Sequence, residues 1–293
     1  MKQIRKIALL NGAGERYGFN GELGIYATGL AGFGVALSPS FADLNRGFFA
    51  RVNDELEPQG TLAFTIVFTQ NPYKLYEDFV NWISASDALS IAYNPTGDQE
   101  YHRDVTVSSI LKGELTNVGW LEIPCSFSCL TPWYLPSPTS LRMEQSNDAE
   151  TKVYDYVYSD VLRFGSESAA SFSGEVAGAG HIPGSLEISY YGAISNPRIR
   201  LSGNISGKTY GICSIAAVLG ETDRLHFSTK YENSFVKQIS ATGAETDLLD
   251  KLDLLTNPFF HIPVSEPCTL SMEADTEFTG TADMLVYYYY RSV

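Results

Sequence analysis

The chain has 293 residues, of which 44% are hydrophobic and 18% are charged, and a mass of 32.2 kDa. These proportions exclude a disordered chain and suit two domains of ordinary size, each with its own core. The 20 basic residues against 34 acidic ones give a net charge of −14, which argues against a surface that grips duplex DNA. The apolar run Ile7–Leu10 is too short for a signal peptide and no stretch is long enough to span a membrane, so we expect neither export by this route nor membrane insertion.

The first part of the chain shows short β-strand patterns and one helical pattern. The strongest strand pattern, at residues 60–68, has a large apolar residue at every second position: Leu62, Phe64, Ile66 and Phe68. Asn71 and Pro72 suit the N-cap and the first position of a helix. The apolar stripe predicted for that helix consists of Tyr76, Phe79, Val80 and Ile83. We therefore predict a mostly β first domain with one helix packed across it.

Residues 21–35 contain five glycines, but neither a G-x-G-x-x-G nor a Walker sequence can be placed on them. A loop-rich β-arm with bulges fits such a segment better than a nucleotide-binding loop. We place this arm in Gly21–Asn53, because the segment is difficult to fit into a compact core. The candidate arm residues are Gly24, Gly29, Phe33 and Phe41.

The stretch 119–138 joins a strand pattern to a proline-rich segment. The apolar face predicted for the strand consists of Ile123, Cys125, Phe127 and Cys129. Three prolines then follow within seven residues, and because proline lacks the amide hydrogen that a sheet ladder needs, the strand must end there. The sequence thus predicts a domain boundary between about residues 131 and 148, drawn as domains 1–134 and 135–293. The candidate residues of the seam between the domains are Trp120, Pro132, Trp133 and Tyr134.

Beyond the seam, short alternating runs separated by turn signals predict an antiparallel β-sandwich. The alternation is clear at Leu186, Ile188 and Tyr190, and a last strand pattern covers residues 284–290. The only helical signal in this part is about one turn at Asp247–Leu252.

No catalytic or metal-binding set can be assembled from the sequence. The histidines His102, His181, His226 and His261 are scattered and form no metal-ligand pair. No G-x-S-x-G motif marks a hydrolase nucleophile. Cys125 and Cys129 would lie about 13 Å apart along one strand, too far for a disulfide or shared zinc, so we expect buried free thiols. We expect no enzyme activity, no cofactor and no metal.

Two carbohydrate-related alternatives remain open. Exposed aromatic side chains on a sandwich can stack on sugar rings, and Tyr154, Tyr156 and Tyr158 are the candidates, although aromatic residues also fill sandwich cores. Binding of residues 140–293 to a glycan array would favour a carbohydrate-binding module or an adhesin for host cell-wall glycans. A glycoside hydrolase would need two carboxylates about 5 to 10 Å apart in a cleft, and turnover of a cell-wall polysaccharide would favour it.

Several patches together resemble one family, the distal tail protein of long, non-contractile-tailed phages, which prophages of Gram-positive bacteria also encode. In the first half these patches are Arg51–Val52, Glu57–Phe64, Tyr73–Tyr76, Trp82–Ile83, Arg103–Val105, Lys112–Leu115, Gly119–Leu121 and Leu130–Tyr134. In the second half they are Asn196–Ile199, Leu225–Thr229, Phe259–Pro263 and Tyr290–Val293. Each patch alone is ordinary strand-and-turn sequence, and it is their order along nearly the whole chain that carries the resemblance.

The resemblance implies a structural baseplate hub: an N-terminal split β-barrel with one helix, followed by a C-terminal galectin-like β-sandwich. The first domain would assemble as a hexameric ring, with the arm of each subunit wrapped around its neighbour. The ring would join the tail tube protein to the tail-associated lysin or tail-tip protein, and DNA would pass through it without specific binding. The second domain would dock either a receptor-binding protein or a host saccharide. Ser265–Glu266–Pro267 replaces the glycine turn and asparagine of many relatives, which speaks against an inherited galectin-type sugar site.

The resemblance also implies a place in the virion, at the phage tail tip, with passage through the host cytoplasm during assembly. A tail tube protein is the nearest alternative within the tail, and the separate C-terminal sandwich argues against it.

Overall fold

The computed structural model of the chain describes residues 5–37, 40–43, 49–53, 56–137, 144–146, 171–275, 278 and 280–293. The chain divides into two compact units, unit 1 with Met1–Pro136 and Tyr289–Val293, and unit 2 with Ser137–Tyr288. The predicted second domain ran to residue 293, whereas the last five residues group with unit 1. In the described part of the chain, no helix has the length and apolar character that a membrane crossing requires.

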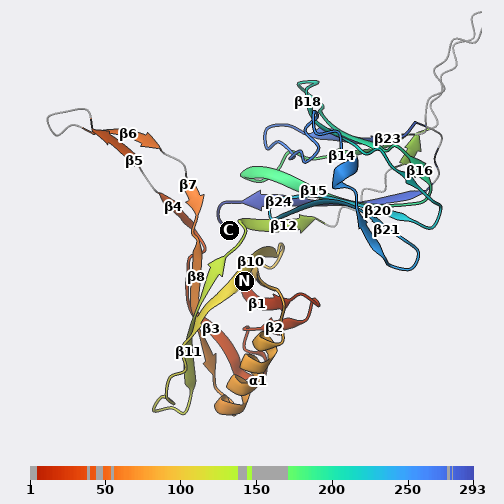
Figure 1. The fold of residues 1–293 in the computed structure, drawn as a ribbon. Coiled ribbons are helices and arrows are strands. Elements are labelled where there is room, and N and C mark those ends of the chain that lie inside the picture. The colour runs from red at the N-terminus through yellow and green to blue at the C-terminus, as the bar shows by residue number, and fades with distance from the viewer. Residues whose placement is uncertain are drawn as a thin grey trace, which may run out of the picture. The chain divides into compact units, whose positions relative to one another are not determined.

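Unit 1 is built from strands, one α-helix and a single 3-10 turn (Figure 1). Its strands are β1 (Lys6–Asn11), β2 (Arg16–Gly18), β3 (Ile25–Ala31), β4 (Val35–Leu37), β5 (Ser40–Asp43), β6 (Phe49–Asn53), β7 (Leu56–Pro58), β8 (Thr61–Phe68), β9 (Leu89–Asn94), β10 (Tyr101–Ile110), β11 (Leu121–Cys129) and β12 (Trp133–Ser137). The 3-10 turn η1 covers Glu22–Gly24, and helix α1 covers Pro72–Ser84.

The main sheet of unit 1 runs in the order β2-β1-β9-β10-β11-β8-β3, with antiparallel pairing throughout. Its two ends approach each other where Asn20 forms an isolated bridge with Tyr26, and the amide of Ala27 donates to the carbonyl of Phe19 at 3.2 Å. Because this contact is an isolated bridge and not a continuous ladder of hydrogen bonds, the barrel does not close between β2 and β3. The predicted mostly β fold with a split barrel and one helix is therefore confirmed.

Alternation along the strands produces the core of unit 1, as the sequence predicts. Leu62, Phe64, Ile66 and Phe68 of β8 are all buried. In β11 the predicted apolar face is buried as far as Phe127, while Cys129 is half-buried. All four cysteines are free thiols, and burial raises the pKa of Cys125 to about 12, so this thiol is inert at neutral pH.

Helix α1 begins where the sequence predicts it, with Asn71 at the N-cap and Pro72 at its first position, but its buried face differs. Asn71 is the N-cap residue, as predicted, but it adopts a left-handed conformation (φ 42°) and its side chain makes no capping hydrogen bond. Phe79 is the buried centre of the helix, and its ring lies 5.1 Å from that of Tyr17. The side chains that pack with it against the core are Leu75, Tyr76, Trp82 and Ile83. Val80, predicted as part of the stripe, is not among them, whereas Trp82 packs on the ring of Tyr17 in β2.

In its described residues unit 2 contains two large sheets, a small two-stranded sheet of β16 and β19, and no α-helix. Its strands are β13 (Glu144–Ser146), β14 (Ser171–Val176), β15 (Ile182–Tyr191), β16 (Ile194–Ser195), β17 (Arg198–Gly203), β18 (Thr209–Ser214), β19 (Val218–Leu219), β20 (Arg224–Lys230), β21 (Asn233–Ile239), β22 (Glu245–Asp247), β23 (Cys268–Glu273) and β24 (Thr281–Tyr290). One sheet runs β24-β15-β20-β21-β22 and the other β13-β14-β23-β17-β18. The predicted helical turn at residues 247–252 is the 3-10 turn η2 (Leu249–Lys251).

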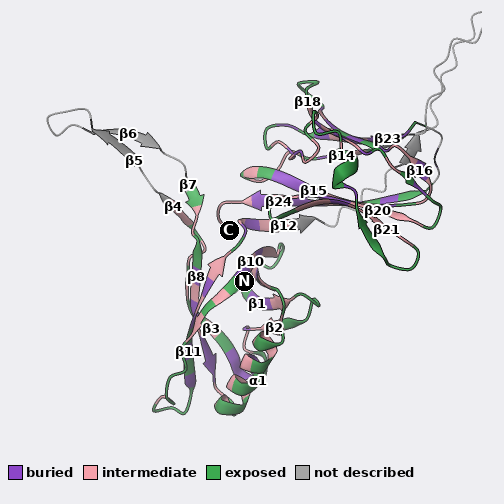
Figure 2. Cartoon of the chain, in the orientation of Figure 1, coloured by how far each residue is buried: buried purple, intermediate pink, exposed green. Residues whose placement is uncertain are grey.

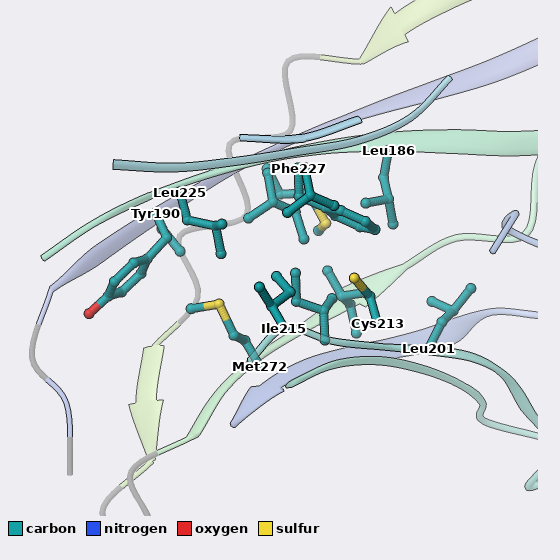
Figure 3. Close-up of a cluster of buried hydrophobic side chains, with 14 of the residues drawn as sticks. Leu186, Tyr190, Leu201, Cys213, Ile215, Leu225, Phe227 and Met272 are labelled. Carbon is teal, nitrogen blue, oxygen red and sulfur yellow. The ribbon is translucent and has the colours of Figure 1, made fainter. Parts of the chain in front are cut away.

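The two sheets of unit 2 enclose one apolar core. Figure 3 shows Leu186 and Phe227 of one sheet facing Leu201 and Cys213 of the other, with no polar side chain among the labelled contacts apart from the Tyr190 hydroxyl. That hydroxyl donates to the carbonyl of Ala193 at 2.9 Å, so the buried tyrosine is satisfied. The predicted β-sandwich is confirmed.

Candidate functional site

A two-stranded ribbon extends β3 and β8 away from the main sheet of unit 1 (Figure 1). Strand β4 pairs with β7, from Val35 opposite Pro58 to Leu37 opposite Leu56, and β5 pairs with β6 beyond them. In the described residues these four strands pair with nothing else, so both edges of the ribbon are open. We call Val35–Pro58 the ribbon.

The chain enters the ribbon through a close crossing at Gly32. Gly32 has φ +90°, and a Cβ atom at this position would lie 2.0 Å from the carbonyl oxygen of Thr61. Only glycine tolerates both the left-handed backbone and the approach of the neighbouring strand. The bulge between Thr28 and Ala31 precedes the crossing and ends the regular pairing of β3 with β8.

The base of the ribbon is anchored by stacked aromatic rings. The ring of Phe33 lies 5.3 Å from that of Trp133 at an interplanar angle of 27°, and 4.8 Å from that of Tyr93. Trp133 is fully buried, and the guanidinium of Arg103 lies 5.6 Å from its ring centroid. Arg103 Nε donates to the carbonyl of Thr131 at 2.7 Å, and burial lowers the pKa of Arg103. Trp133 therefore joins the ribbon base, the central strands and the start of β12.

The predicted seam residues do not form one cluster. Trp120 precedes β11, whereas Pro132, Trp133 and Tyr134 follow its other end. Trp120 is 44% exposed, while Trp133 belongs to the core of unit 1. Tyr134 is half-buried and donates its hydroxyl to Asp104 Oδ1 at 2.8 Å. The division between the units falls after Pro136, inside β12.

The predicted arm residues are spread over the length of β3 and beyond. Gly24 lies at the far end of β3 from the ribbon, where its Cβ position would be 2.7 Å from Thr69 Oγ1. Gly29 lies in the β3 bulge and Phe33 at the ribbon base, so within the predicted segment Gly21–Asn53 the ribbon takes up only the part from Val35 onward. Phe41 lies in β5 of the ribbon. The candidate sugar-stacking residues Tyr154, Tyr156 and Tyr158 lie outside the described residues.

Unit 2 holds two polar clusters that the sequence did not reveal, because their members come from distant strands. Glu266 accepts hydrogen bonds from the amides of Ile205 (3.0 Å) and Ser206 (2.9 Å), from Ser206 Oγ (2.6 Å) and from the Tyr210 hydroxyl. The hydrogen bonds from Ser206 and Tyr210, with those of the backbone, lower the pKa of Glu266 to about 2. Glu266 thus fastens the β17–β18 turn, and all of its acceptor positions serve the fold.

The second cluster centres on Glu187 of β15. Its Oε1 lies 2.6 Å from His226 Nε2, and its Oε2 lies 3.1 Å from both Lys230 Nζ and the Tyr287 hydroxyl. Burial alone would raise the pKa of Glu187, but the ion pair with Lys230 and the hydrogen bond from His226 outweigh it and lower the pKa. The carboxylate is fully occupied by these partners. Among the described residues no group of three or more metal-ligating side chains occurs.

The combination of a ribbon, a split barrel and a separate sandwich is a fold that solved phage baseplate proteins share. The chain is similar to a structure described as that of the phage p2 baseplate in its activated conformation with Sr, at a TM-score of 0.64 and 14% identity, over 99% of this chain and 100% of that chain. It is also similar to the SPP1 Dit (gp 19.1) protein, described as a paradigm of the hub adsorption apparatus in Gram-positive infecting phages, at a TM-score of 0.53 and 8% identity. That match covers 96% of this chain and 98% of the other. No curated protein matches the chain.

Residues 6–130 match the family model of the distal tail protein, N-terminal domain. The resemblance to the distal tail protein seen in the sequence is confirmed over this part of the chain. The match supports a structural, non-enzymatic protein of the phage tail and virion.

Proposed function

We propose that six copies of the chain form a ring that joins the tail tube to the tail tip and acts as a docking hub. The ribbon carries this proposal. A two-stranded ribbon is at best marginally stable alone in water, and open strand edges invite pairing with another chain. Since the ribbon is anchored at Phe33 and pairs with nothing else in the described residues, a neighbouring subunit is the natural partner for its edges.

In this ring the tube protein would contact one side and the tail-associated lysin or tail-tip protein the other. DNA would pass through the ring without specific binding, in keeping with the net charge of −14, and the chain would assemble in the host cytoplasm. Unit 2 would dock either a receptor-binding protein or a host saccharide.

Native mass spectrometry of the full chain, supported by negative-stain images, tests the proposal. We expect a species of about six times 32.2 kDa with a central hole. A variant in which residues 35–58 are replaced by a short turn should remain folded but become monomeric. The absence of a ring, both for the chain alone and after addition of the tube and tail-tip proteins, would overturn the proposal, as would a ring that survives loss of the ribbon.

A further inference from the structure

One end of the unit 1 sheet gathers exposed apolar side chains. Ile25, Phe68 and Leu121 are cross-strand neighbours in β3, β8 and β11, so η1, the start of α1 and the turn before β11 all meet at this end. Eight large hydrophobic side chains are exposed among the described residues of unit 1, and all except Leu130 lie on these segments or beside them. We call six of them the apolar end: Leu23, Tyr26, Tyr73, Leu115, Val118 and Trp120.

The exposure of the apolar end is substantial. Leu23 is 77% exposed, Val118 68% and Trp120 44%, and Figure 2 shows the turn before β11 and the first turns of α1 largely as exposed. Single exposed hydrophobic residues are ordinary, but a group that includes a tryptophan at one end of a sheet is typical of a protein–protein contact.

These side chains are held in place by local contacts. The amide of Thr116 donates to the carbonyl of Trp120 at 2.7 Å, and the amide of Trp120 donates to Thr116 Oγ1 at 3.1 Å, which closes the turn. Lys112 Nζ lies 5.2 Å from the ring centroid of Tyr73, which ties this turn to helix α1. A contact surface that is already ordered loses less entropy when a partner binds.

The backbone of Leu23 gives an independent indication. Leu23 has φ 59°, a left-handed conformation that is unfavourable for a leucine, and yet its side chain points into solvent. The backbone strain is therefore not compensated by burial within the chain. Strained positions of this kind concentrate at functional sites.

The charges around the apolar end restrict the partner. Glu22, Glu77, Glu114 and Glu122 are exposed on the same segments. Glu22 interacts electrostatically with Arg16, but the guanidinium of Arg16 is paired with Glu100. Of the two lysines present, Lys112 has its ammonium group over tyrosine rings. A complementary partner would therefore present an apolar centre bordered by lysine or arginine.

We propose that the apolar end docks a different protein of the tail, one whose facing surface has an apolar centre and a basic border. The proposal rests on the hub function proposed above and names the docking surface on unit 1. A second copy of the chain is a poor occupant, because with 20 basic against 34 acidic residues it has few basic groups to border this acidic surface. A neighbour's ribbon is equally unsuitable, since residues 35–58 contain four acidic residues and only two arginines.

The test compares Val118→Asp and Trp120→Ala with the control Leu130→Asp. Leu130 is 64% exposed, much like Val118, but follows the other end of β11. The probes are the purified tail tube protein and tail-tip protein of the same phage, bound to the immobilised full-length chain at low and high salt. We expect both variants at the apolar end to weaken binding of one probe by roughly tenfold or more, the control to leave it unchanged, and high salt to weaken it.

The docking surface and the hub function are tested by different measurements. The mass of the wild-type chain and of every variant, measured first, tests ring formation, and the binding of the probes tests the docking surface. A missing ring in the wild-type chain counts against the hub function, while probe binding can still be measured on the monomer. Failure of both probes to bind the wild-type chain, or equal binding by Val118→Asp and Leu130→Asp, overturns the inference and leaves the ring intact. A change of ring mass in Val118→Asp also overturns it, since the surface would then belong to contacts between copies.

Discussion

Replacement of Trp133 by alanine tests whether this residue is a core residue of unit 1 or part of a seam between domains. Trp133 is fully buried, with Phe33 stacked on it and Arg103 over its ring. Truncating a buried tryptophan to alanine typically costs about 3 to 5 kcal/mol, because apolar contacts are lost and a cavity remains. The buried guanidinium of Arg103 also loses its aromatic neighbour, so we expect an effect at the upper end of this range.

The matched control is Trp120→Ala, which removes the same atoms from an exposed position. Substitutions at such positions usually change the free energy of unfolding by less than about 1 kcal/mol. For a unit of about 140 residues, a difference of about 4 kcal/mol corresponds to a decrease in Tm of roughly 10 °C.

Thermal unfolding of the full chain, combined with hydrogen–deuterium exchange, measures the effect and locates it. In Trp133→Ala we expect lost protection in β9, β10 and the ribbon base, with the β15 and β20 strands of unit 2 unchanged. Equal destabilisation by the two substitutions, or a loss of protection confined to unit 2, would refute the assignment of Trp133 to the unit 1 core.

Two further predictions concern the crossing at Gly32 and the carboxylate of Glu266. Gly32→Ala should destabilise unit 1 by about 1 to 3 kcal/mol, because φ is positive and the added Cβ would overlap the Thr61 carbonyl. The control is Gly34→Ala, because no atom lies within 4 Å of the Cβ position at Gly34. Chemical denaturation measures the free energy of unfolding of both variants, and equal effects would contradict the reasoning. The folded-state pKa of Glu266 lies at about 2, below its unfolded value, so its stabilisation is present above about pH 4.5 and is lost as pH falls toward 2. Thermal unfolding between pH 5 and pH 2 should therefore show a shallower loss of Tm in Glu266→Gln than in the wild-type chain, and parallel curves would show that this carboxylate does not contribute.

The sequence alone determined the strand content of both units and the buried face of the best strands. The large apolar residues alternate regularly from Leu62 to Phe68 and from Ile123 to Phe127, and they are buried as expected, although Val67 on the other face of β8 is buried as well. Helix α1 could be located for a similar reason, since proline at its first position and a three- and four-residue spacing leave few alternatives. The order of the patches along the chain was also sufficient to indicate the distal tail protein family.

Tertiary structure decided which of several equivalent residues carry each role. Trp120 and Trp133 both lie next to β11 in the sequence, but one precedes the strand and is exposed, while the other follows it and is covered by Phe33 from a segment 100 residues earlier. Likewise Gly24 and Gly32 look alike as glycines, yet only Gly32 lies at the crossing into the ribbon. Burial, register and close backbone approach depend on contacts between residues far apart in the chain, and a pattern of neighbouring residues contains no information about those distances.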